Sequence, residues 1–388
     1  MQTIYLDHAA TTATDPVVVE AMLPYFHEHY GNPSSIYSIS RSTKNAIENA
    51  RQILAQALGA DAQEIVFTSG GSESDNFAIK GVAHALRQKG NHIITSQIEH
   101  HAVLYTCRFL EKNGYRVTYL PVDKFGIVKL NELEKSISPQ TILISIMHAN
   151  NEIGSIQPIR EIGEIARKNK ILFHTDAVQT FGHIPINVNE LNVDLLSISA
   201  HKFYGPKGVG ALYIRRGSKI TPLIHGGDQE RRRRASTENV PGIIGMGKAV
   251  EIALEIMENE IDRQSTLRDE FIQKILSKID DAILNGHPTK RLPNNINISF
   301  VGIEGESILL NLDMEGIAAS TGSACSSSSL EPSHVLLATG LSHEYAHGSV
   351  RFTMGKNTTL EELNYVIEVL PGIVKKLRAM SPLYQKKG

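Results

Sequence analysis

The sequence predicts an α/β fold: a mainly parallel, seven-stranded sheet flanked by helices, followed by a smaller α+β domain. Between residues 64 and 215, short β-branched or apolar runs alternate with longer helix-like stretches, a pattern typical of a parallel sheet covered by helices. Most of these runs are continuously apolar, as expected for strands buried on both faces. After about residue 250 the pattern changes to a long charged helix and a few alternating strands.

The elements follow in order along the chain. The expected strands of the large sheet are residues 65–67, 92–95, 117–120, 141–146, 171–174, 195–198 and 210–214. Helix-like segments such as 74–88 and 159–170 separate them. The later region is expected to hold a helix at 249–278, strands at 296–300 and 349–353, and a final helix at 360–380. We expect a large domain over residues 15–258 and a small domain formed by residues 1–14 and 259–388.

Composition excludes several classes of protein. Hydrophobic residues make up 41% and charged residues 21% of the 388 residues, an ordinary globular balance for two domains. The net charge of -2 gives no field that favours nucleic acid, so no direct nucleic-acid binding is expected. No apolar run approaches the roughly 18 residues of a membrane span.

The cysteine content and the first residues point to a compartment. Two cysteines, Cys107 and Cys325, cannot build a disulfide framework in a chain of this size, which favours a reducing environment. The first seven residues lack the basic and apolar regions of a signal peptide. We therefore expect a cytoplasmic protein.

Three strand ends carry chemically useful side chains. The strand at 65–67 runs into Gly70-Gly71-Ser72 and then a helix, where free N–H groups and a hydroxyl can hold a phosphate. Asp176 follows the strand at 171–174, and a buried carboxylate of this kind needs a partner, such as a protonated ring nitrogen. Lys202 follows the strand at 195–198, where a desolvated amine could form a Schiff base.

Because ligands of parallel sheets bind at the carboxyl ends of the strands, these groups are expected to meet. A phosphate cradle that includes Ser199 and His201, a pyridinium partner and an amine together indicate pyridoxal 5'-phosphate (PLP). Each signal alone is weak, since a glycine turn, a helix N-cap and a surface lysine are common.

The chain resembles the NifS/IscS-like cysteine desulfurases, a group within the class V PLP-dependent aminotransferases. The matching stretches occur in the family's order and span nearly the whole chain: residues 5–12, 31–35, 68–76, 99–100, 150–154, 176–179, 199–208, 323–325 and 330–334. The resemblance implies the PLP-dependent transferase fold type I. It also implies removal of sulfur from L-cysteine, giving L-alanine and a persulfide on Cys325 that passes to an acceptor protein, for iron–sulfur cluster assembly or tRNA thiolation.

The same resemblance implies a role for each matching residue. Lys202 would carry PLP as a Schiff base, and Asp176 would pair with its pyridine nitrogen. His100 would stack on the ring and assist proton transfer. Arg351 would bind the substrate carboxylate through its planar guanidinium, and Asn151 would also contact the substrate. The remaining cofactor contacts would come from Asn151 and Gln179 near the ring hydroxyl, from Gly71, Ser72, Ser199 and His201 at the phosphate, and from Thr237 across a homodimer interface.

Two positions depart from the family's pattern. Ser72 stands where the family more often has threonine, which keeps the hydroxyl. Ser236 stands where the family usually has glycine, so a positive φ there would strain the backbone before Thr237.

The two cysteines are expected to differ. Cys325 precedes four serines in a polar segment, which could form a mobile loop that collects sulfur and delivers it. Cys107 lies in an apolar helical segment and is expected to be a buried core residue.

Three other motifs are decoys. His343 to His347 fits the HExxH zinc pattern, but a strand follows at once and no third ligand is evident, so no metal is expected. Residues 205–210 lack the GK[ST] of a nucleotide-binding loop. The four arginines at 231–234 are expected to form a solvated loop near the dimer-related site.

Two alternatives stay open at this point. One is another PLP enzyme of the same fold, a selenocysteine lyase or an aminotransferase of small amino acids. The other is a catalytically weak sulfur-relay or scaffold-binding protein. The sequence does not name the sulfur acceptor.

Overall fold

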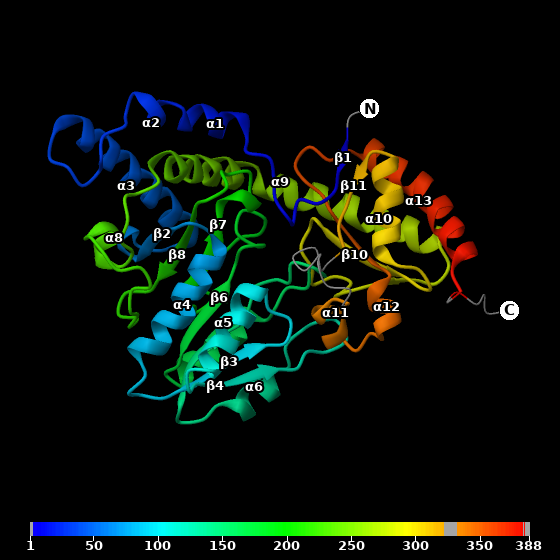
Figure 1. Cartoon of the computed structure of the whole chain (residues 1–388), viewed down its shortest axis with the longest axis horizontal. Helices are drawn as coiled ribbons and strands as arrows, with labels where there is room; N and C mark the ends of the chain where they lie inside the picture. The colour runs from blue at the N-terminus through cyan, green and yellow to red at the C-terminus, as the bar shows by residue number, and fades with distance from the viewer. Residues whose placement is uncertain (1–2, 322–331, 383, 385–388) are drawn as a thin grey trace.

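The computed structural model describes residues 3–321, 332–382 and 384. Its main sheet has seven strands in the order β2-β8-β7-β6-β5-β3-β4 (Figure 1). The strands are β2 Ile65–Thr68, β3 His92–Ser96, β4 Arg116–Leu120, β5 Thr141–Ser145, β6 Leu172–Asp176, β7 Leu195–Ser199 and β8 Gly210–Ile214. All seven predicted strands are present, each within two residues of its predicted ends.

Only β8 runs antiparallel to its neighbours in this sheet. Ten residues separate the end of β7 from the start of β8, too few for a parallel crossover, so the chain turns back beside β7. The carboxyl ends of β2 and β7 and the start of β8 therefore share one edge. This edge holds both the glycine turn after β2 and the loop that carries Lys202.

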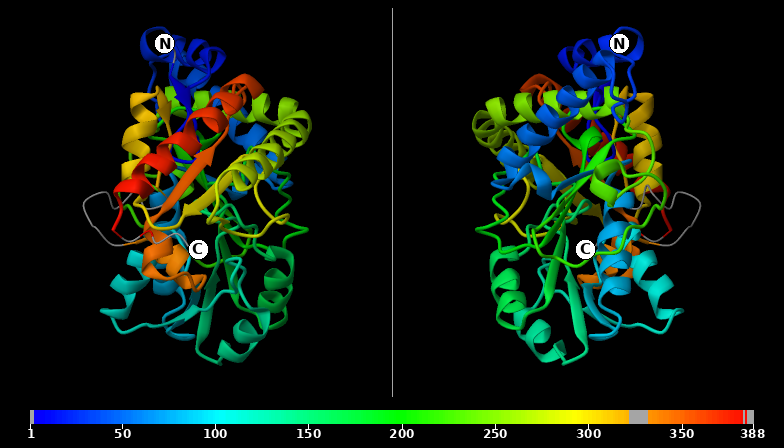
Figure 2. Two further views of the ribbon diagram at one scale, coloured as in Figure 1. Left: turned by 90° about the vertical axis from the view of Figure 1, so that its right-hand side faces the viewer. Right: turned by 90° about the vertical axis from the view of Figure 1, so that its left-hand side faces the viewer.

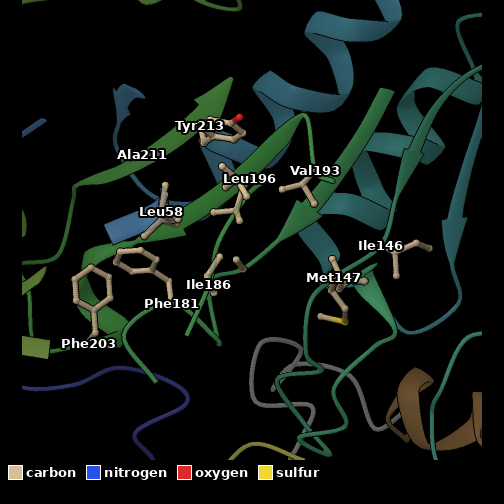
Figure 3. Close-up of a cluster of buried hydrophobic side chains, with 14 of the residues drawn as sticks. Leu58, Ile146, Met147, Phe181, Ile186, Val193, Leu196, Phe203, Ala211 and Tyr213 are labelled. Carbon is tan, nitrogen blue, oxygen red and sulfur yellow. The ribbon is translucent and has the colours of Figure 1, made fainter. Parts of the chain in front are cut away.

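Helices cover both faces of the sheet. Those of this part of the chain are α1 Pro16–Met22, α2 Pro24–His27, α3 Ser38–Leu58, α4 Gly71–Ala85, α5 His101–Glu111, α6 Leu130–Ser136, α7 Ile159–Lys168 and α8 Gln229–Arg232, with short 3-10 turns at Ala62–Glu64 and Ala200–Lys202. Side chains alternate along the strands: Val66, Leu195 and Leu212 face a core formed with α4 and α5, whereas Leu196 and Ala211 face the opposite core. Figure 3 shows this second core, in which Phe181 meets Phe203 edge to face at 5.2 Å.

A single long helix, α9 Val240–Lys278, joins the two parts of the molecule (Figure 1). It begins nine residues before its predicted start, because the Asn239 side chain caps it and Pro241 occupies its first turn. Its first half packs in the core of the large sheet through residues such as Met246, and its second half packs in a separate core through Phe271.

The second core belongs to a smaller α+β part. It holds a sheet of order β12-β10-β9, a parallel pair β1-β11, and helices on one side of that sheet (Figure 2). These elements are β1 Ile4–Tyr5, β9 Ala282–Leu284, β10 Asn295–Phe300, α10 Gly305–Met314, β11 Ile317–Ala318, α11 His334–Ala338, α12 His343–His347, β12 Ser349–Thr353 and α13 Leu360–Met380. Leu6 is buried in this core, so the N-terminal segment packs with the C-terminal third of the chain. The domain bounds given above stay a prediction, and the two separate cores support them.

In the described part of the chain, no helix is long and apolar enough to cross a membrane.

Candidate active site

A cavity of about 370 Å³ lies at the carboxyl ends of the parallel strands. Its walls come from the segments that follow β2, β3, β5, β6 and β7, from the N-terminal segment and from β12. The predicted residues on its walls are Gly71, Ser72, His100, Asn151, Asp176, Gln179, Ser199, His201, Lys202 and Arg351. The fold thus brings together side chains that are up to 280 residues apart in the chain.

The turn between β2 and α4 has the features of an anion site. Gly70 has φ 151° and ψ −175°, a conformation open to glycine alone, and it lies directly before α4. No side chain in the described residues caps this helix, so its first N–H groups can bind an anion. A Cβ at Gly71 would lie 2.6 Å from Val178 Cγ2, so glycine keeps the turn close to the segment after Asp176. These features fit the phosphate of PLP.

Asp176 ends β6 and is buried against the cavity. Its Oδ1 accepts a hydrogen bond from the Val178 N–H at 2.9 Å. Burial raises the pKa of Asp176 to about 6, although the Val178 bond and the charge of Lys202 act in the opposite direction. A buried carboxylate at this position is stabilised by a cation, and the protonated ring nitrogen of PLP is a cation of the right kind.

Asp75, on α4, is a second buried acid on the wall, which sequence reasoning missed. Burial and the nearby charge of Asp176 hold the pKa of Asp75 well above its ordinary range. Two like charges in one buried site cannot both be stable, so the site favours one ionised carboxylate and one neutral acid. Nothing in the local sequence distinguishes Asp75 from a polar helix residue.

Lys202 is held by backbone carbonyls from a distant segment. Its Nζ donates to Ala9 O at 2.5 Å and to Ala10 O at 2.7 Å. The carbonyl of Lys202 accepts a hydrogen bond from His183 Nε2 at 3.0 Å. These contacts fix Lys202 at the carboxyl ends of the strands. No local sequence signal could have shown that Ala9, Ala10 and His183 contact it.

His100 is the N-cap of α5, and its Nδ1 accepts a hydrogen bond from the Ala102 N–H at 3.1 Å. Burial, together with the nearby charges of Lys202, His101 and His334, lowers the pKa of His100 to about 4. At neutral pH the imidazole is therefore neutral, with its proton on Nε2. It can donate a proton or hydrogen bond from that nitrogen.

Arg351 reaches the cavity from β12 and is 3% exposed. Its Nη1 donates to Asn151 O at 2.9 Å, and its Nη2 donates to Asp7 Oδ1 at 2.8 Å. Gln179, also on the wall, donates from Nε2 to Ala9 O at 3.0 Å. The His201 ring bonds to Thr11 Oγ1 through Nδ1 at 3.0 Å, and burial lowers the pKa of His201 to about 4.

Among the predicted residues that the structure describes, Thr237 is not on the cavity wall. Thr237 is exposed and lies in a second cavity of about 240 Å³ beside Arg234 and Asn239. Its neighbour Ser236 has φ 103°, so the glycine-to-serine departure falls at a position where a Cβ causes strain. Cys325 lies outside the residues that the structure describes.

The other cysteine and the decoy motifs have ordinary structural roles. Cys107 is fully buried in α5, and burial raises the pKa of its thiol, so the prediction of a core residue is confirmed. The helix α12 has five residues and is followed by Gly348 and β12, which confirms that it is too short for a zinc-protease helix. Residues 205–210 lead into β8.

The arginine run is not a simple solvated loop. Glu230, Arg231 and Arg232 all have positive φ, between 47° and 66°. The buried Glu230 carboxylate makes a two-point ion pair with Arg51 of α3, at 2.7 and 2.8 Å, and accepts a hydrogen bond from the Phe67 N–H of β2 at 2.9 Å, so this turn is held against β2. Arg234 pairs with Glu73 in the first turn of α4 at 2.8 Å.

Comparison with known proteins assigns the chain to a group. The family described as aminotransferase class-V matches residues 4–366. The chain is 63% identical to the cysteine desulfurase IscS of Dictyoglomus turgidum, over 99% of this chain and 97% of that protein. It is 62% identical to the cysteine desulfurase IscS of Methanosarcina thermophila, over 99% and 95%.

Solved structures agree with these sequences. A NifS-like protein superposes with a TM-score of 0.91 at 41% identity, covering 97% of this chain and all of the other. The structure described as SspA in complex with cysteine has a TM-score of 0.81 at 41% identity, covering 91% and 99%. The expected PLP-dependent transferase fold type I, and dependence on PLP, are therefore confirmed.

Proposed function

Because this chain belongs to the cysteine desulfurases of the class V aminotransferase family, we propose that it removes sulfur from L-cysteine, giving L-alanine and a persulfide on Cys325. The observation that carries the proposal is the single cavity that unites Asp176, Lys202, His100 and Arg351. Ordinary aminotransfer needs no thiol, whereas desulfuration needs a sulfur acceptor; because Cys107 is buried in the core, Cys325 is the candidate for that role.

The residues on the wall divide the binding of PLP among them. Asp176 would hold the ring nitrogen, Lys202 the aldehyde carbon, and the turn at Gly71 and Ser72 the phosphate, with Ser199 and His201 beside it. His100, Asn151 and Gln179 would contact the ring and its hydroxyl. When bound, PLP supplies an electron sink for the negative charge that develops on the substrate.

The protein's own groups carry the remaining steps. Arg351 binds the substrate carboxylate, and the Lys202 amine, once displaced by the substrate amine, takes the proton from the substrate Cα. The neutral His100 offers the Nε2 proton to the substrate. The Cys325 thiolate then attacks the substrate sulfur: an S–S bond forms, the C–S bond breaks, and its electron pair stays on the substrate Cβ, which is protonated as alanine is formed.

We further propose that the protein acts as a homodimer in the cytoplasm. The exposed position of Thr237, outside the cavity of its own chain, supports a contact to the phosphate of a partner subunit. A reducing compartment would keep the Cys325 thiol available. The persulfide would pass to an iron–sulfur scaffold or a tRNA-thiolating enzyme. Light scattering of Thr237→Ala and the native protein, with PLP content measured in parallel, tests the dimer contact.

The decisive experiment compares the two cysteines. Cys325→Ser should retain the visible absorbance of bound PLP but stop release of sulfide and alanine from cysteine, and Cys107→Ala, the matched control, should keep activity. Normal desulfuration by Cys325→Ser would refute the assignment of the acceptor. Lys202→Ala should lose the PLP absorbance. Parallel assays with selenocysteine, and with cysteine plus a keto acid, separate the desulfurase from a selenocysteine lyase and an aminotransferase.

A further inference from the structure

The N-terminal segment crosses the candidate active site as a strap, defined as residues 4–12. It starts as β1, which pairs with β11 of the small part. Further along, Thr12 N and Oγ1 donate to the carbonyl of His201, in the loop that carries Lys202. Between these anchors the strap passes β12, where Asp7 pairs with Thr353 and the Ala9 N–H donates to Thr353 Oγ1 at 2.9 Å.

Asp7 is the acidic residue of this strap, and its side chain turns to Arg351. The distance from Asp7 Oδ1 to Arg351 Nη2 is 2.8 Å. Side-chain exposure is 19% for Asp7 and 4% for Arg351, so the ion pair is largely screened from water. The backbone of Asp7 is fixed as well, because its carbonyl accepts a hydrogen bond from Tyr5 Oη at 3.1 Å and from the Ala10 N–H at 3.0 Å.

The guanidinium of Arg351 is only partly used by the protein. Nη1 donates to Asn151 O and Nη2 to Asp7, yet Nε has no acceptor among the described residues although it is buried. A buried donor without a partner costs about 1–3 kcal/mol, so within the described residues the guanidinium is held through Nη1 and Nη2 at this cost. Because Arg351 lines the cavity, the position in which Asp7 and Asn151 hold it decides how the guanidinium meets a bound substrate.

We propose that Asp7 is a positioning residue for substrate recognition: it holds the Arg351 guanidinium at the cavity wall, in the orientation that binds the α-carboxylate of the amino-acid substrate. The inference rests on the proposed role of Arg351. Asp7 supplies the countercharge that a buried guanidinium requires, and its contact at Nη2 fixes the orientation of that group beside the cavity. By positioning Arg351, Asp7 makes the site bind amino acids more tightly than thiols that lack a carboxylate.

A purely structural role makes a different prediction. If Asp7 only tied the strap to β12, its loss would loosen the segment that also holds Lys202, and all ligands would be affected alike. Thr353→Val is the matched control, because it removes the neighbouring bond between strap and β12 and leaves the guanidinium intact.

The experiment uses the PLP-loaded enzyme and two ligands, L-cysteine and cysteamine, which lacks the carboxylate. Asp7→Ala should raise KM for cysteine about tenfold or more, as expected when a binding group is misplaced, with kcat within about threefold. Inhibition by cysteamine and the PLP absorbance should not change. Asp7→Asn, which keeps an oxygen acceptor without the charge, should recover part of the loss. Thr353→Val should leave KM for cysteine near the native value.

The outcomes separate this inference from the proposed function. An unchanged KM for cysteine in Arg351→Ala would refute the proposed binding of the substrate carboxylate by Arg351. If Arg351→Ala raises KM for cysteine and Asp7→Ala leaves it unchanged or lowers it, the role of Arg351 is supported and the role of Asp7 is refuted. Equal shifts for cysteine and cysteamine in Asp7→Ala would also refute it, in favour of the structural role. If Asp7→Ala does not fold, the same comparison is made with Asp7→Asn.

Discussion

The strained residue Ser236 should make the protein more stable when it is replaced by glycine. Its φ of 103° costs a residue with a Cβ about 1–3 kcal/mol. The gain is reduced by about 0.4–1 kcal/mol, because glycine has more freedom in the unfolded chain. The side chain is exposed and the Ser236 N–H bond to Gln229 Oε1 does not need it. Ser236→Gly should therefore raise the free energy of unfolding by about 1 kcal/mol.

Chemical denaturation is the suitable assay for this change. The unfolding entropy is about 2.1 cal/mol/K per residue, so in a chain of 388 residues a gain of this size shifts Tm by only about 1 °C. Ser236→Ala is the matched control: alanine keeps the Cβ and the strain, so it should give no gain. The explanation by strain is refuted if both variants change stability equally, or if Ser236→Gly destabilises the protein. PLP content should be measured alongside, since Thr237 follows.

Three other changes test the site and its support. Glu230→Gln should lower the free energy of unfolding, measured in urea, by about 3–5 kcal/mol, because it leaves the Arg51 guanidinium buried without its main countercharge. Glu48→Gln, which alters a half-exposed pair with Arg51, should lower it by less than about 1 kcal/mol. Similar losses of stability in the two variants would contradict this reasoning. Because the pKa of Asp176 is raised to about 6, its carboxyl group holds a proton in the folded cofactor-free protein that it has lost in the unfolded chain above about pH 4. The contribution of Asp176 to the unfolding free energy should thus fall as pH rises from about 4 to about 6, whereas buried histidines such as His100 act in the opposite direction. The unfolding free energy of the native protein minus that of Asp176→Asn should therefore fall over this range; a difference that does not change with pH would refute the assignment. Gly71→Ala should weaken PLP binding about tenfold, because its Cβ would lie too close to Val178. Gly372→Ala, whose Cβ has no neighbour within 4 Å, should bind PLP normally. Equal PLP affinity in both variants would show that the turn at Gly71 tolerates a side chain.

The secondary structure was largely predictable because burial requires a pattern of apolar residues within each element, and this pattern can be seen in the sequence. Strands covered on both faces are largely apolar, and runs of apolar or β-branched residues located all seven strands of the large sheet, including the partly exposed edge strand β4. Boundaries were less predictable where capping decides them, as at Asn239, since a cap depends on one side chain and not on a pattern. The antiparallel direction of β8 follows from the short connection after β7. The apolar pattern predicted a mainly parallel sheet but did not indicate which strand would run antiparallel.

The sequence by itself determined which residues end the strands, and therefore that Asp176, Lys202 and the Gly71 turn would meet, because parallel strands place their carboxyl ends on one edge. Only the tertiary structure decided what surrounds them. Ala9 and Ala10 hold Lys202, Asp75 lies near enough to Asp176 for their charges to interact, and Asp7 holds Arg351 across 344 residues of chain. Such contacts depend on how separate elements pack and leave no periodic signal in the sequence. The strain at Ser236 lies between these cases, since the sequence shows the serine and only the fold imposes its φ.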